Sequence, residues 1–341
     1  MRKTWSVALA LAGMAAAAAA QQPAGYHVLR RLAVGGEGGW DYITVDAAAR
    51  RLYVTHGTHV VVLNADSGTV VGDIANTPGV HGVAIAAGLG RGFISDGRDS
   101  TVTIFDLKTL AVLGRPHVTG ANPDAILFNA PTGKVFAFNG RTANATVLDA
   151  ATGAVRGTIA LDGKPEFAVT LDSAVYVNIE DRSELLRIDP KAETAPAHGL
   201  SLAPCEEPSG LAVDADHKRL FAVCGNKLLA VVDPVANRLV TTVPIGAGVD
   251  AAAFDPSSQL VFASNGEGTL TVIHEDDPNH YTVVETVPTQ RSARTCALDA
   301  TTHRLFLPAA EFGPAPAPTV DQPRPRPSMM PGSFTVLVVG R

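Results

Sequence analysis

The sequence Ile43-Thr-Val-Asp46 is followed by a short turn and then by Arg51-Leu-Tyr-Val54. Each half is a run of β-branched, aliphatic and aromatic residues, which is the composition typical of a β-strand. Two such runs separated by so few residues predict a hairpin of two antiparallel strands.

The hairpin pattern recurs seven times along the chain. Counting seven residues back from the aromatic residue of each second strand gives positions 46, 86, 129, 169, 214, 255 and 299, which lie 40 to 45 residues apart. A third strand follows each pair, as at 102–106, and a Thr-Gly-type turn leads to a fourth, as at 151–159. Four strands in a period of about 40 residues predict one blade of a β-propeller. The expected fold class is therefore all-β: a seven-bladed β-propeller with four-stranded antiparallel blades. Two β-sandwiches, the competing architecture, would not repeat one period seven times.

The two ends of the chain are expected to complete one blade together. The last repeat stops after its third strand, 334–339, and the N-terminal stretch Tyr26–Val34 has no blade of its own. Pairing these segments would close the ring and leave no gap between the first and last blades.

Composition limits the class of protein. The chain has 341 residues, of which 46% are hydrophobic and 18% charged, with a formal net charge of −6. A disordered chain would be more highly charged, and a nucleic-acid-binding protein needs a basic patch, so neither class is expected. Three cysteines are too few for a disulfide scaffold and are not spaced as a zinc site.

The first twenty residues read as a signal peptide. Arg2 and Lys3 precede an apolar, alanine-rich run that ends at Ala20, after which the chain turns polar. The run is too short and too weakly apolar for a membrane span, and no later segment is apolar enough for one. We therefore expect an exported protein, periplasmic or secreted, in which residues 21–341 form one monomeric propeller domain. Without Arg2 and Lys3, 25 basic residues face 33 acidic ones, a charge of −8.

The repeats resemble a known family. The motif Arg51-Leu-Tyr-Val-Thr-His56, the repeated Val-x-Asp and the Thr-Gly turns are similar to the YVTN (YncE-like) family of seven-bladed propeller repeat proteins, over nearly all of the chain after residue 20. The resemblance implies the fold but leaves the function open, because the family includes binding proteins, scaffolds and enzymes. Lactonases and lyases built on seven blades share only the architecture, since none of their catalytic motifs occurs here.

One position of the repeat is occupied by a polar or charged residue in every blade. Loops that enter the first strands should converge at the mouth of the central channel. The residues five positions before each counted position are Asp41, His81, Asp124, Glu166 (after realignment on Pro165), Ser209, Asp250 and Arg294. A rim that faces water must be polar, but solvation alone does not require crowded carboxylates. These residues are the candidate binding site, together with Asn139 and Asn265 at the ends of second strands, where Asn-Gly turn chemistry is the alternative explanation.

The same face offers candidate metal ligands. Asp41, His56, His81 and Asp96 are expected in adjacent blades, and imidazole with carboxylate suits Zn, Mn or Fe, whereas carboxylates with amide oxygens suit Ca or Mg. One divalent cation is therefore one alternative. Without it, some of the crowded carboxyl groups should titrate high and could serve as general acids.

Two further features depart from the plain repeat. Residues 311–333 replace a short turn with a Pro-rich loop, which is either a lid carrying Arg324 and Arg326 over the acidic mouth or a plain surface excursion. Cys205 and Cys224 should lie at one face of blade five and form a disulfide, the alternative being two free thiols. Cys296, inside a first strand, should stay a buried thiol.

Two functions fit these residues. The favoured one is a non-catalytic binding protein for a small molecule or a periplasmic protein, because no nucleophile motif or phosphate loop occurs. The alternative is a metal-assisted, lactonase-like hydrolase or a lyase. In it a cation would polarise a carbonyl group, His81 or Glu166 would move a proton, and Arg294 would hold an anionic group.

Overall fold

The computed structural model describes residues 25–36, 38–317, 319, 325 and 327–341. The predicted signal peptide, residues 1–20, lies outside the described residues, as do Arg324 and Arg326 of the Pro-rich loop. Within the described part of the chain no helix is long or apolar enough to cross a membrane.

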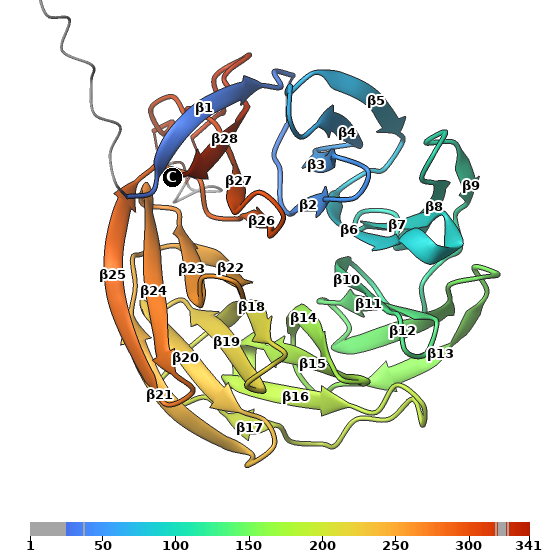
Figure 1. The fold of residues 1–341 in the computed structure, drawn as a ribbon. Coiled ribbons are helices and arrows are strands. Elements are labelled where there is room, and N and C mark those ends of the chain that lie inside the picture. The colour runs from blue at the N-terminus through green and yellow to red at the C-terminus, as the bar shows by residue number, and fades with distance from the viewer. Residues whose placement is uncertain (1–24, 37, 318, 320–324, 326) are drawn as a thin grey trace, which may run out of the picture.

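Seven four-stranded antiparallel sheets are arranged in a ring, as the sequence predicts (Figure 1). Blades one to three are formed in chain order by β2 (Ile43–Asp46), β3 (Arg51–His56), β4 (His59–Asn64) and β5 (Val70–Ala75); β6 (Val80–Ala86), β7 (Arg91–Asp96), β8 (Thr101–Asp106) and β9 (Val112–Gly114); and β10 (Pro123–Asn129), β11 (Lys134–Asn139), β12 (Asn144–Asp149) and β13 (Val155–Ala160). Blades four to six are formed by β14 (Pro165–Leu171), β15 (Ala174–Ile179), β16 (Glu184–Ile188) and β17 (Leu200–Ser201); β18 (Pro208–Asp214), β19 (Arg219–Cys224), β20 (Leu228–Asp233) and β21 (Arg238–Pro244); and β22 (Val249–Asp255), β23 (Leu260–Asn265), β24 (Thr269–Asp277) and β25 (His280–Pro288). Two short 3-10 turns, Ala87–Leu89 and Glu180–Arg182, lie in inter-strand connections.

The seventh blade joins the two ends of the chain. It consists of β26 (Ala297–Asp299), β27 (Arg304–Ala309), β28 (Thr335–Gly340) and, as its outer strand, β1 (His27–Ala33). The pairing of β1 with β28 runs from His27 opposite Gly340 to Ala33 opposite Thr335. This confirms the predicted closure of the ring by the N-terminal strand, which is drawn in blue beside the red last blade in Figure 1.

The aromatic residues that define the repeat form the packing between blades. All seven are buried: Tyr53, Phe93, Phe136, Tyr176, Phe221, Phe262 and Phe306. Tyr53 of β3, for example, packs against Phe105 of β8 in the next blade, with ring centroids 5.7 Å apart. Because each blade buries its faces against both neighbours, the ring is held by apolar contacts that repeat with the sequence period.

The cysteines behave partly as expected. Cys205 and Cys224 form a disulfide, with Cα atoms 5.8 Å apart, which ties the loop before β18 to the end of β19. Cys296 does not lie within a strand, because β26 begins only at Ala297. Its side chain is half-buried and lines a small cavity of about 60 Å³ inside the ring, where shielding from bulk water raises the pKa of the thiol to about 12.

Candidate functional site

The residues that begin the inner strands lie together at one end of the ring, which we call the mouth. His81, Asp124, Glu166, Ser209 and Asp250 are each the second residue of β6, β10, β14, β18 and β22. In all five strands the pairing register with the second strand shifts at this point. A register shift interrupts the regular pairing of the strand and changes the direction of a side chain. The same irregularity therefore orients the rim residue in each of these five blades.

Asp41 joins the rim residues of neighbouring blades. Its Oδ2 accepts a hydrogen bond from Nδ1 of His81 at 2.7 Å, and its Oδ1 accepts one from Nη2 of Arg294 at 3.2 Å. Nδ1 of His81 also lies 3.5 Å from Oδ1 of Asp124, and Nε of Arg294 lies 2.9 Å from Oδ2 of Asp250. Residues more than 250 positions apart in the sequence therefore meet in one network of ion pairs.

Arg294 keeps an unused donor in this network. Although Nε lies close to Asp250, its N–H bond is not directed at the carboxylate, so the contact is an ion pair without a hydrogen bond. Within the described part of the chain this buried N–H has no acceptor.

Lys164 completes the rim and was not predicted. Its ammonium group lies 2.8 Å from Oε1 of Glu166 and also pairs with Glu180. The sequence could have indicated it, because Lys164 stands only two residues before Glu166 in the loop that enters β14. The mouth thus carries three basic groups among at least five carboxyl groups.

The crowding changes the protonation of the mouth. Burial alone would lower the pKa of His81, but the hydrogen bond to Asp41 and the charges of Asp124, Asp41 and Glu166 raise it to about 9, so the imidazole is protonated at neutral pH. Burial raises the pKa values of Asp124, Glu166 and Asp250 above their ordinary range, against the opposing effects of His81, Lys164 and Arg294. The mouth therefore holds protons that can be exchanged near neutral pH.

Asn139 and Asn265 do not face the channel mouth. Both side chains are fully buried and donate to hydroxyl groups of the third strand of their own blade: Asn139 to Thr146 at 2.9 Å, and Asn265 to Thr271 at 2.9 Å. Their polar atoms lock one strand to the next and are not accessible to a ligand. The assignment of these two residues to ligand binding is corrected accordingly.

The predicted metal set is also divided by the structure. Asp96 is fully buried and accepts hydrogen bonds from Thr101 and Thr103, whereas Nε2 of His56 lies 2.9 Å from the carbonyl oxygen of Gly35. Both residues end second strands, like Asn139 and Asn265, and point into the protein. His56 and Asp96 thus do not join Asp41 and His81.

A smaller set of possible ligands remains at the mouth. One ligating atom each from Asp41, His81 and Asp124 lies within 4.8 Å of the others, a spacing that could hold a divalent cation. A second such group, Asp214, His217 and Glu275, was not predicted; Asp214 ends β18 and so lies at the opposite end of that strand from the rim residue Ser209.

The comparisons with known proteins bear on the fold. No family model matches the chain, and no curated protein matches its sequence. Among solved structures, the crystal structure of the RRP9 WD40 repeats is similar with a TM-score of 0.74 at 9% identity, covering 92% of this chain and 97% of that one. The structure of U3-55K is similar with a TM-score of 0.73 at 9% identity, covering 92% and 98%. The chain is a seven-bladed β-propeller. At this identity the likeness concerns the fold alone, and propellers commonly mediate binding.

Proposed function

We propose that the protein is an exported binding propeller of the YVTN type, whose ligand site is the acidic mouth of the channel. The observation that carries the proposal is the ion-pair network in which Asp41 joins His81 to Arg294. Carboxylates from several blades accept hydrogen bonds from hydroxyl or ammonium groups, so a cationic or polyhydroxylic small molecule fits the mouth. The exposed part of the Arg294 guanidinium group would fix its orientation.

Binding without catalysis is favoured by the state of the mouth residues. His81 is protonated and held between two carboxylates, so it is a poor general base at neutral pH. Among the seven rim positions the one hydroxyl group is that of Ser209, which donates to the carbonyl oxygen of Val249 at 3.4 Å and has no base beside it in the described part of the chain. This arrangement supports recognition more than nucleophilic chemistry.

A thermal-shift screen of amines and polyols (putrescine, choline, glucose and inositol) would test the proposal. We expect at least one hit, with affinity reduced at least tenfold in Asp124→Asn and unchanged in the exposed control Asp216→Asn. The melting temperature of ligand-free Asp124→Asn should stay the same or rise, because crowded carboxylates repel one another. Hits that bind both variants equally would contradict a site at the mouth.

Metal-assisted hydrolysis or elimination is the second candidate, favoured by the spacing of Asp41, His81 and Asp124. A Ca, Mg, Mn or Zn ion there would polarise a carbonyl group, Glu166 with its raised pKa would move a proton, and Arg294 would hold an anionic group. His81 must lose its proton to ligate, so metal affinity should rise with pH. Metal analysis of protein purified without chelator tests this: a stoichiometric ion lost in His81→Ala but kept in Asp96→Asn would favour the enzyme.

Export is tested separately. Cleavage after Ala20 would give a mature chain that begins at Gln21, which the mass of the protein recovered from the periplasm or medium would reveal. Protein that keeps residues 1–20 and stays in the cytoplasm would contradict this part of the proposal.

A further inference from the structure

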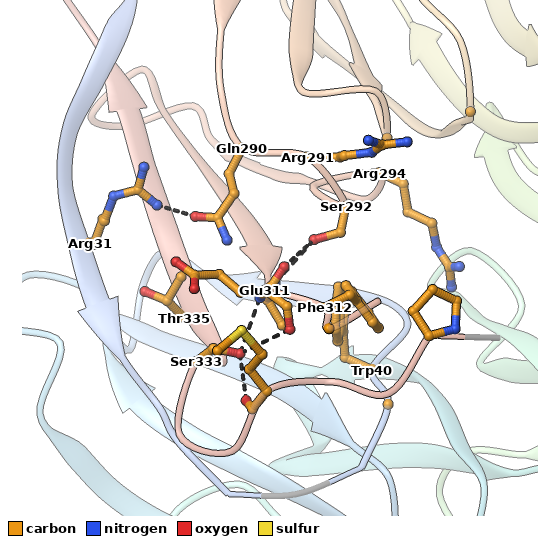
Figure 2. Close-up of a pocket in the computed structure, with 17 residues that line it drawn as sticks. Arg31, Trp40, Gln290, Arg291, Ser292, Arg294, Glu311, Phe312, Ser333 and Thr335 are labelled. Atoms are coloured by element: carbon orange, nitrogen blue, oxygen red, sulfur yellow. Dashed lines mark hydrogen bonds between the residues drawn. The ribbon is translucent and has the colours of Figure 1, made fainter. Parts of the chain in front are cut away.

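A large pocket lies beside the mouth, where the two ends of the chain meet. Its volume is about 1450 Å³, and its walls come from β1, from the loops before β2 and after β25, and from both ends of the connection between β27 and β28 (Figure 2). The closing strand β1 contributes Arg31 to it, which bonds to Gln290 in the loop between blades six and seven. Apart from Arg294, none of the charged residues of the mouth lines it.

One wall of the pocket is aromatic. Trp40 stacks on Phe334 with ring centroids 5.1 Å apart and contacts Phe312 at 5.9 Å. Phe312 is 45% exposed, and the neighbouring Met330 is 47% exposed. An aromatic ring that is supported from behind and open in front is a platform for a planar group.

The charged lining is mainly basic. Figure 2 shows Arg31 on one side of the pocket and Arg291 with Arg294 on the other. Arg31 donates a hydrogen bond to the side-chain oxygen of Gln290, and within the described residues neither Arg31 nor Arg291 forms an ion pair. Glu311 is the one carboxylate among the lining residues. Among the described lining residues, two guanidinium groups without an ion pair therefore outweigh one carboxylate.

We propose that this pocket binds a small organic anion that carries an aromatic ring. The ring lies on Phe312, backed by Trp40, and the anionic group pairs with the guanidinium group of Arg31 or of Arg291, which flank the pocket on its two sides. This site goes beyond the proposed function, because its ligand has the opposite charge to that expected at the mouth and uses different residues. The anionic group is a carboxylate or a phosphate, which share this chemistry.

Isothermal titration of the full chain with four probes tests the site. Phenyl phosphate and benzoate should bind, inorganic phosphate should bind at least tenfold more weakly for lack of a ring, and benzylamine should not bind. The tighter of the two aromatic anions identifies the preferred group. In a Trp5→Phe background Trp40 is the only tryptophan, so its fluorescence should change on binding and report the location.

Variants separate charge, stacking and location. Arg31→Gln/Arg291→Gln should weaken phenyl phosphate binding at least tenfold, whereas Glu311→Gln should strengthen it severalfold because a repelling charge is removed. The matched control Arg187→Gln/Arg238→Gln makes the same charge change on exposed residues of blades four and five and should have no effect. Melting temperatures of all variants show whether each is folded.

The proposal would be overturned by no binding of either aromatic anion, by benzylamine binding as tightly as phenyl phosphate, or by unchanged affinity in Arg31→Gln/Arg291→Gln. Binding that is lost in Asp124→Asn but kept in the double arginine variant would place the anion at the mouth and would also overturn it. Binding that survives Asp124→Asn supports this site even if no ligand of the mouth is found.

Discussion

Replacing Asp96 by Asn should stabilise the protein above about pH 6. Asp96 ends β7 with a fully buried side chain whose Oδ2 accepts hydrogen bonds from the hydroxyl groups of Thr101 at 3.1 Å and Thr103 at 2.6 Å. Its Oδ1 has no partner among the described residues, and burial raises the pKa of the carboxyl group to about 6. Asn139 and Asn265 hold the corresponding place in their blades and make similar bonds without a charge.

The size of the effect follows from the pKa difference. The folded carboxyl group has a pKa of about 6 against 3.8 for the ordinary value, and one unit corresponds to about 1.4 kcal/mol, so ionised Asp96 costs at most about 3 kcal/mol. Because the folded state holds the proton more tightly, stability falls as the pH rises from about 4 to 6 and stays lowered above that range. The substitution should therefore add roughly 1–3 kcal/mol at pH 8 and little at pH 4.

Urea unfolding at pH 4 and pH 8 measures both limits. The control is Asp216→Asn, in which the replaced carboxylate is exposed and no pH-dependent gain is expected. Metal content should not change in Asp96→Asn. A variant less stable than wild type at pH 8 would refute the reasoning, since it would mean that the charge itself is required at this position.

Three further outcomes are expected. His81→Gln removes a group whose pKa is about 9 in the folded protein against an ordinary value of 6.5. The stability that this group supplies, about 3 kcal/mol, is complete below pH 6.5 and is lost as the pH rises through 9. A stability difference from wild type that stays constant in urea titrations from about pH 6 to 10 would contradict this. Cys205→Ser/Cys224→Ser opens a link across 19 residues and should cost about 3 kcal/mol in urea unfolding, with one thiol reactive in denatured wild type. Leu32→Ala, in the closing strand, should cost about 2–4 kcal/mol and deletion of 27–33 far more, whereas unchanged melting temperatures would mean that β1 does not hold the ring.

The sequence period predicted which residues of different blades lie close together. In a ring of equivalent blades, the same place in the repeat is the same place in space. Counting from the buried aromatic residues was therefore enough to bring Asp41, His81 and Arg294 to one mouth, although 253 residues separate the first from the last. The disulfide could be predicted in the same way, since the repeat places both cysteines at one face of one blade.

The direction of side chains at strand ends was not predictable in this way. Asp96 and Asn139 end second strands, where a polar residue can face the channel or turn back into its own blade. Hydroxyl groups decide between these directions, because Thr103 and Thr146 on the third strands lie within hydrogen-bond distance. In both blades a threonine stands seven residues after the residue that ends the second strand. This spacing can be read from the sequence, and it indicates a side chain that bonds within its own blade.

The polar residues around the channel therefore fall into two groups with different consequences. Rim residues of the first strands, such as His81 and Asp124, interact with rim residues of other blades through ion pairs at the channel mouth. Asp96, Asn139 and Asn265, which end second strands, bond to hydroxyl groups of their own blade and leave nothing to a ligand. Substitution of the first group should change binding and pH dependence while the blades stay intact. Substitution of the second group should change stability and leave binding alone, because a buried polar group that loses its partner costs folding free energy wherever the ligand lies.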